Sequence, residues 1–189
     1  GAVGALQPLA IKWMIDDGVL LKGPDGELAP LPVRLRHAML VVGFGVKAAI
    51  VPMHTWLPDA HSAAPSGISA MLSGIVIEAG LITMLKALLA LSGVTFGLLL
   101  VILAVVTMFV GNLIALRQSD LKRMFAYSSV AQMGYIVMGV GLALGFPTVA
   151  AFSGMRGALY HILNHAIMKG GAFLCAGAFL YILGTRDIR

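Results

Sequence analysis

Long apolar runs separated by short polar connections are the main feature of this chain. Each run reaches the ~20 residues that a helix needs to cross the hydrocarbon core of a bilayer. Because the runs are continuous and far longer than a typical strand, the pattern predicts helices. The chain is therefore expected to be an all-α integral membrane protein, a multi-helix transmembrane bundle. The expected helices occupy about residues 37–57, 66–91, 94–116, 124–145 and 157–183.

The first 36 residues differ from the rest. Residues 1–16 are apolar enough to be the end of a preceding helix, whereas residues 17–36 are rich in aspartate, glycine and proline and predict a polar loop. The expected organisation is this helix end and loop over 1–36, then the central part of a transmembrane domain over 37–189. Because the chain begins with Gly1 and shows no signal peptide, we expect a piece of a longer protein.

Composition places the chain in the membrane class. It is 59% hydrophobic and 11% charged, with a mean hydropathy of +0.95, whereas soluble domains carry about 25% charged residues. The net charge of +5 is scattered between the apolar runs, so it indicates loops at a membrane surface and not a nucleic-acid patch. Basic residues are denser in the loops at 117–123 and 184–189, which favours a cytoplasmic location for that side. The single cysteine, Cys175, lies in an apolar run and is expected to serve packing.

Lys47 lies near the middle of the run 37–57. A lysine at mid-span costs ~2.5–3.5 kcal/mol on insertion scales, and its default interpretation is functional. Pro52 follows five residues later, and a proline inside a helix removes a backbone hydrogen bond and clashes with the preceding turn. The helix is expected to kink or break close to Lys47, where the broken backbone would line a hydrated cavity.

Four other titratable residues also lie inside apolar runs: Glu78, His161, His165 and Lys169. The last three are spaced by four residues, and each step advances ~6 Å along a helix and ~40° past a full turn, so they share one face. No carboxylate or cysteine accompanies the two histidines, so a metal site is not expected. A proton relay fits better, because histidines titrate near neutrality. The alternative is that they only hydrogen-bond neighbouring helices. Glu78 is expected to pair with a lysine of a neighbouring helix.

The linker after the first run is a candidate proton entrance. Its titratable residues are His54, Asp59 and His61, and the alternative is a polar turn at the surface. Trp56 suits an anchor at the level of the lipid headgroups.

Helix ends are also expected around this linker, since Pro58 and Pro65 stop helices and Ser66 can cap the next one. The polar residues that precede the fourth run are expected to be surface charges, namely Asp120, Lys122 and Arg123. Polar residues within that run could hold water beside the relay or, more commonly, join helices by hydrogen bonds, namely Ser128, Ser129, Gln132 and Tyr135.

Three long motifs, in this order, carry a family resemblance. GVKAAIVPMHTWLPDAHSAAPSGISAMLSG, SDLKRMFAYSSVAQMGYIVMG and YHILNHAIMKGGAFL followed by GTRD resemble the antiporter-like membrane subunits of respiratory complex I, of Mrp cation/proton antiporters and of energy-converting membrane-bound hydrogenases. The resemblance implies a fourteen-helix fold with inverted repeats and broken helices. It implies that Lys47 is the essential lysine of the first broken helix, and that His161, His165 and Lys169 belong to the central relay.

One position departs from the family pattern. Many relatives carry a lysine, in a pattern like LLKLG, where this chain has VIEAG with Glu78. A relay from lysine to lysine therefore cannot be transferred across this position. Glu78 is expected to be either a partner of Lys47 or a proton site of its own.

The resemblance implies a proton- or sodium/proton-translocating subunit of a redox-driven complex, such as an NADH:quinone oxidoreductase-like or membrane-bound hydrogenase complex. This chain has no cysteine cluster and no glycine-rich nucleotide loop, so no cofactor is expected in it. Flavin and iron–sulfur clusters are expected in partner subunits of a peripheral redox arm, beside other membrane subunits in a prokaryotic cytoplasmic membrane. The alternatives are a stand-alone Mrp-type antiporter without redox coupling and a structural subunit whose buried charges only hold helices together.

Overall fold

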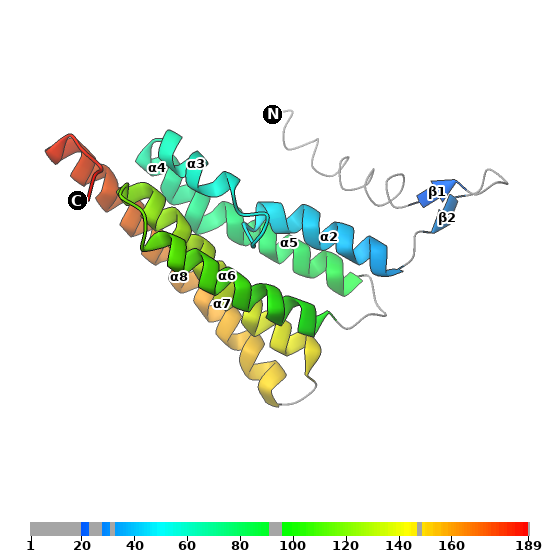
Figure 1. The fold of residues 1–189 in the computed structure, drawn as a ribbon. Helices are drawn as coiled ribbons and strands as arrows, with labels where there is room; N and C mark the ends of the chain where they lie inside the picture. Colours follow the sequence, from blue (N-terminus) through cyan, green and yellow to red (C-terminus); the bar gives the residue numbers. More distant parts are fainter. Residues whose placement is uncertain (1–19, 23–27, 31–32, 91–95, 147–148, 189) are drawn as a thin grey trace.

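A computed structural model describes residues 20–22, 28–30, 33–90, 96–146 and 149–188. Within these ranges, helices account for almost the whole structure (Figure 1). A short antiparallel pair of strands, with Leu21 opposite Ala29, lies in the region for which only a loop was expected. The elements in chain order are β1 (Leu20–Lys22), β2 (Leu28–Pro30), α2 (Val33–Lys47), α3 (Trp56–Ala63), α4 (Ser66–Met71), the π-helix η1 (Leu72–Val76), α5 (Ile77–Ala90), α6 (Gly97–Ala115), α7 (Leu121–Gly145) and α8 (Val149–Leu183).

The expectation of an all-α membrane bundle is confirmed. Four helical stretches of the described chain are long and apolar enough to cross a bilayer, namely Ser66–Leu88, Gly97–Ala115, Leu121–Gly145 and Ala151–Leu183. The first of them is formed by α4, η1 and α5 in succession. α8 begins at Val149, well before the expected start at residue 157. The helix end predicted for residues 1–16 lies outside the described residues.

The helices form two neighbouring groups. Figure 1 shows α2 alongside α5, while α6, α7 and α8 run side by side, and contacts between these elements agree with the view. α8 also packs on α4 and η1, which joins the two groups, and α3 lies against α7. The buried apolar core extends from the end of α2 through α5 to the facing sides of α6 and α7.

The run 37–57 is not one helix but a broken one. α2 ends at Lys47, Ala49 has the positive φ of +54° that non-glycine residues rarely adopt, and α3 begins only at Trp56. Two hydrogen bonds hold the break: Val51 N donates to Thr107 Oγ1 at 3.2 Å, and the Trp56 indole donates to Val46 O at 2.6 Å. Trp56 therefore folds back over the break, one residue from Lys47.

The expected helix limits after the break need correction. Pro58 lies inside α3 and does not stop it, because a proline in the first turn of a helix removes no intrahelical hydrogen bond. Pro65 precedes α4 as its N-cap residue. Ser66 is the first residue of α4, and no side-chain cap hydrogen bond is formed there.

Glycines allow the long helices to approach each other closely. At Gly134 of α7, an added Cβ would lie 2.9 Å from the Ala104 carbonyl oxygen of α6. At Gly139 of α7, it would lie 2.6 Å from the Gly154 carbonyl oxygen of α8. Small residues at such contacts are the usual means of tight helix packing in membranes. The packing sets α7 between α6 and α8 and fixes which face of α8 points inward.

Candidate functional site

A π-helix interrupts the helix that carries Glu78. η1 occupies Leu72–Val76, two residues before Glu78, and such π segments are frequent at functional sites. η1 is held from both neighbouring helices. Ser73 Oγ and Ser129 Oγ of α7 are 2.6 Å apart, and a Cβ at Gly74 would lie 3.0 Å from the Ala166 carbonyl oxygen of α8. The wider turn thus places Glu78 at the surface shared with α8.

Glu78 binds a histidine of α8. Its Oε1 lies 2.8 Å from His165 Nδ1, and the side chains are only 6% and 0% exposed, respectively. The expectation of a lysine partner for Glu78 is therefore wrong. Lysine side chains of the described chain do not reach this carboxylate within ion-pair distance. The second ring nitrogen of His165, Nε2, is buried without a hydrogen-bond partner in the described structure.

His161 continues the line from His165. The two imidazole rings are 6.3 Å apart, and His161 Nε2 lies 2.7 Å from Gln132 Oε1 of α7. Because an amide oxygen only accepts, His161 donates from Nε2, and in the neutral ring Nδ1 is then an acceptor. Glu78, His165, His161 and Gln132 thus form a polar line drawn from α5, α8 and α7, in which two hydrogen-bonded pairs are linked by the facing histidine rings.

Lys169 lies on the same face of α8, one helical turn after His165 and on the opposite side of it from His161. It is only 3% exposed, and its ammonium donates to the Phe125 carbonyl oxygen at 3.2 Å. The same ammonium lies 5.8 Å from the centre of the Phe125 ring, within the range of a cation–π contact. The hydrogen bond to this carbonyl satisfies only one of the three donors of the ammonium. The other two N–H groups of the Lys169 ammonium can therefore donate to water molecules.

Lys47 lies beside this line at the end of α2. Its side chain packs on Gly80 of α5, two residues after Glu78, where an added Cβ would lie 2.8 Å from Lys47 Cγ and 3.0 Å from the Lys47 carbonyl carbon. Neither a hydrogen bond nor an ion pair joins Lys47 to Glu78, so the structure does not pair them directly. Lys47 reaches the helix of Glu78 because Gly80 leaves room for it.

Replacing Gly80 with alanine tests this close contact. Because the methyl group would meet the backbone of Lys47, we expect Gly80→Ala to lower the stability of the protein by ~1–3 kcal/mol, the usual cost of overpacking. The measurement is the thermal unfolding midpoint of the purified protein in detergent. Gly67→Ala is the matched control, because a Cβ there meets nothing within 4 Å. Equal midpoints for both variants would contradict the contact.

The three candidate entrance residues lie in different surroundings. His54 is buried against Tyr127, with ring centres 6.2 Å apart. Asp59 is 72% exposed and forms a 3.1 Å ion pair with Arg123. His61 is fully buried and stacks on Phe173 of α8, with ring centres 4.4 Å apart. The structure therefore does not bring these three residues together into one group.

His61 is held in its neutral form. Burial, reinforced by the positive charges of Lys122 and Lys169, lowers the pKa of His61 to about 4. Within the described chain, neither ring nitrogen has a hydrogen-bond partner. The His61 imidazole is therefore uncharged at neutral pH, chiefly because it is buried.

The expectation that Lys122 is a surface charge is wrong. It is 2% exposed, and its ammonium donates to the Ala64 carbonyl oxygen at 2.6 Å. The pattern that would have placed it inside is the spacing of buried positions on α7, where Lys122 is followed at helical intervals by Ala126 and Ser129. Asp120 caps α7 by accepting a hydrogen bond from Arg123 N at 2.9 Å.

These features define a helical membrane protein with an interior line of titratable groups, contributed mainly by one long helix. The described residues contain no group of three or more histidine, cysteine or acidic side chains that could hold a metal ion. The chain belongs to the NADH:quinone oxidoreductase/Mrp antiporter transmembrane family, which matches it over residues 28–189. It is an integral membrane protein.

Among curated relatives, the chain is similar to hydrogenase-4 component B of Escherichia coli (strain K12), with 41% identity over 155 residues, 77% of this chain and 23% of the relative. It is also similar to NADH-quinone oxidoreductase subunit M of Rickettsia prowazekii (strain Madrid E), with 36% identity over 152 residues, 79% of this chain and 30% of the relative. The chain thus spans about a quarter of the length of these relatives.

Two solved structures resemble the fold. The membrane-bound sulfane sulfur reductase, described as an archaeal respiratory membrane complex, matches with a TM-score of 0.72 and 34% identity, over 82% of this chain and 26% of that chain. The Mrp complex from Dietzia sp. DQ12-45-1b matches with a TM-score of 0.68 and 26% identity, over 82% of this chain and 28% of that chain. The fourteen-helix arrangement with inverted repeats stays a prediction, because this chain spans only part of such a fold.

Proposed function

We propose that the chain is part of a proton- or sodium/proton-translocating membrane subunit of a redox-driven complex. The observation that carries this proposal is the buried contact between Glu78 and His165, which continues to His161 and Gln132 inside a bundle of apolar helices. Ionisable groups in a membrane interior are costly, and groups arranged in a line from one helix face are typical of proton paths.

The geometry suggests how a proton would be held and passed on. The Glu78 carboxylate accepts a hydrogen bond from His165 Nδ1, which leaves His165 Nε2 as the free position for a proton. A proton taken there turns the contact into a buried ion pair, and its release restores a neutral imidazole. His161 and Lys169 are the next titratable groups along α8, one helical turn to either side of His165, and the His161 and His165 ring centres are 6.3 Å apart.

Lys47 would act on this line from outside it. Its charge sits at the break of the α2–α3 helix and against the helix of Glu78. A cation near a carboxylate favours the ionised form of that carboxylate. Movement of Lys47 relative to α5 would therefore change the proton affinity of Glu78 and His165. We propose that His54, which lies within the break, and Asp59 and His61 of α3 serve the proton entrance.

The redox-driven assignment rests on the names of the relatives. They are a hydrogenase component, a formate hydrogenlyase subunit and NADH-quinone oxidoreductase subunits. We propose that this chain binds no cofactor and is a non-redox subunit of the translocase, with flavin and iron–sulfur clusters in partner subunits of a peripheral redox arm. Other membrane subunits would adjoin it in the cytoplasmic membrane of a prokaryote, as the bacterial relatives suggest.

A stand-alone Mrp-type cation/proton antiporter is the second candidate, favoured by the structural likeness to the Mrp complex. The two functions are separated by purifying the intact assembly that contains this chain and reconstituting it into vesicles. Ion uptake that starts on addition of an electron donor, with flavin or iron–sulfur subunits copurifying, supports the redox-driven function. Sodium-driven proton movement without any electron donor, in an assembly lacking redox subunits, would replace it with the antiporter.

A further inference from the structure

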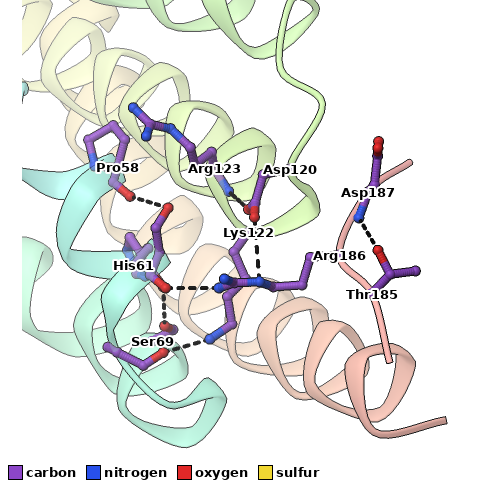
Figure 2. Close-up of polar contacts among 11 residues, drawn as sticks. Pro58, His61, Ser69, Asp120, Lys122, Arg123, Thr185, Arg186 and Asp187 are labelled. Carbon is purple, nitrogen blue, oxygen red and sulfur yellow. Dashed lines mark hydrogen bonds and ion pairs between the residues drawn. The ribbon is translucent and has the colours of Figure 1, made fainter. Parts of the chain in front are cut away.

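The carboxyl end of α3 lies near a cation of α7 and a cation of the segment that follows α8. The last carbonyl groups of any helix have no intrahelical N–H partner and need others. Arg186 Nη1 donates to Ser62 O at 2.8 Å, and the Lys122 ammonium donates to Ala64 O at 2.6 Å. Figure 2 shows the Lys122 and Arg186 side chains reaching toward the helix that carries His61. The hydroxyl group of Ser69 donates to His61 O at 3.3 Å. All three carbonyl groups therefore find their partners outside α3.

The two cations suit this place electrostatically. The carboxyl end of a helix carries a partial negative charge, and cations stabilise it. Lys122 is nevertheless 2% exposed, and a buried ammonium is costly unless its surroundings satisfy it. Arg186 also lies 3.5 Å from Asp120 Oδ2, so one carboxylate balances part of this positive charge. We call Lys122, Arg186 and Asp120 the α3 clamp.

The backbone around the α3 clamp ties α7 to the end of α8. Leu121 N donates to Arg186 O at 2.9 Å, and Ile188 N donates to Ser119 O at 3.0 Å. The loop before α7 and the segment after α8 thus form one hydrogen-bonded unit. Through this unit, the end of α3 is fixed to α7 and α8, two of the three helices that carry the polar line.

A second contact, between aromatic rings, holds α3 against α8. His61 of α3 stacks on Phe173, which lies one helical turn after Lys169 on α8. The side chains of the Arg123–Asp59 ion pair are 40% and 72% exposed, so the pair adds little, as surface pairs generally do. The buried clamp and the stacked rings are therefore the contacts that set where α3 lies.

We propose that Lys122 and Arg186 are positioning residues that hold the half-helix α3 and thereby set the position of the break next to Lys47. This inference rests on the proposed function, because the break matters only if Lys47 takes part in translocation. α3 follows the break directly, so a shift of α3 on α7 is transmitted to residues 48–55 and to Lys47. The clamp is the mechanical link between the broken helix and the relay on α8.

The test is amide hydrogen exchange, followed by mass spectrometry, on the intact complex carrying Lys122→Met. Methionine keeps most of the side-chain volume but cannot donate to Ala64 O. We expect residues 56–64 to exchange ~tenfold faster or more, since hydrogen bonds to charged groups are among the stronger ones. Arg117→Met is the matched control, because Arg117 is an exposed cation of the same loop region. It is expected to leave the exchange of α3 unchanged.

Variants of Arg186 provide a second, independent test. They show whether the clamp positions α3 even if the Lys122→Met complex does not assemble. Arg186→Met is expected to speed exchange of the same residues, and Arg186→Lys, which keeps a cation near Ser62 O, is expected to restore most of the protection. In the assembled Met variants, the number of ions translocated per electron is expected to fall while electron transfer continues.

Two results would overturn the positioning role. One is unchanged exchange of α3 in both methionine variants. The other is lost translocation with unchanged exchange in Lys122→Met, which would make Lys122 a proton carrier. Because exchange is measured without turnover, its outcome is separate from that of the proposed function. Faster exchange of α3 together with full ion translocation by a Lys47 variant would retain the clamp and reject the role of Lys47.

Discussion

Replacing Lys47 with alanine is expected to reduce redox-driven ion translocation by ~100-fold or more while the complex still assembles, since proton-transfer groups contribute at least this much and the Lys47 charge sets the proton affinity of those on the Glu78 line. The side chain packs on Gly80 of the helix that carries Glu78, at the end of the first half of a broken helix. Alanine removes the side-chain part of this contact together with the Lys47 ammonium, so movement of α2 no longer carries a positive charge relative to Glu78. The measurement is donor-driven acidification of vesicles containing the purified complex.

Lys86→Ala is the matched control for this experiment. Lys86 lies on α5, the same helix that Lys47 contacts, but is exposed near its far end, so losing it should leave translocation close to that of the unaltered protein. Lys47→Arg keeps the charge with a larger head and should retain part of the activity. An assembled Lys47→Ala complex that translocates ions at the full rate would remove Lys47 from the mechanism.

The membrane architecture and the break could be anticipated from the sequence because both depend on local physics. Apolar length alone predicts spanning helices, and a lysine followed by Pro52 predicts a disrupted helix near Lys47. The sequence did not predict how the backbone is held at the break. The return of Trp56 to Val46 O and the bond from Val51 N to Thr107 depend on contacts that no periodicity encodes.

The partners of the titratable groups could not be deduced in the same way. Glu78 and His165 are 87 positions apart, and their contact depends on the π-helix η1 and on Gly74 fitting against Ala166. A carboxylate in a membrane suggests a cation, and lysine is the residue that a sequence offers first. The structure selects a histidine instead, because α8 rather than α2 presents its polar face to Glu78.

The burial of Lys122 was also missed, because the sequence predicts a surface charge there. Lys122 stands next to Asp120 and Arg123 at the start of a helix, and charged residues in such clusters are usually exposed to solvent. Its burial follows from the half-helix α3, whose carboxyl end needs donors at this point. The need for a buried cation could therefore be recognised only after the break in the preceding helix was known.

The contact between Glu78 and His165 leads to the second large effect. Glu78→Gln preserves shape and one hydrogen-bond acceptor but removes the charge that stabilises a protonated His165, so translocation is expected to fall by ~100-fold or more. His165→Asn removes the titrating ring from the same contact and is expected to cause a similar loss.

If the two residues act as one proton-holding unit, their effects will not add. Groups in direct contact show interaction free energies of ~0.5–3 kcal/mol in double-mutant cycles, and residues that act as a unit lose nearly everything with the first change. The Glu78→Gln, His165→Asn double variant should therefore be about as impaired as either single variant. Lys86→Ala again serves as the control, because Lys86 is exposed and lies two helical turns beyond Glu78 on the same helix. Losses that simply multiply in the double variant would mean that Glu78 and His165 move protons independently, and the line along α8 would then begin at His161.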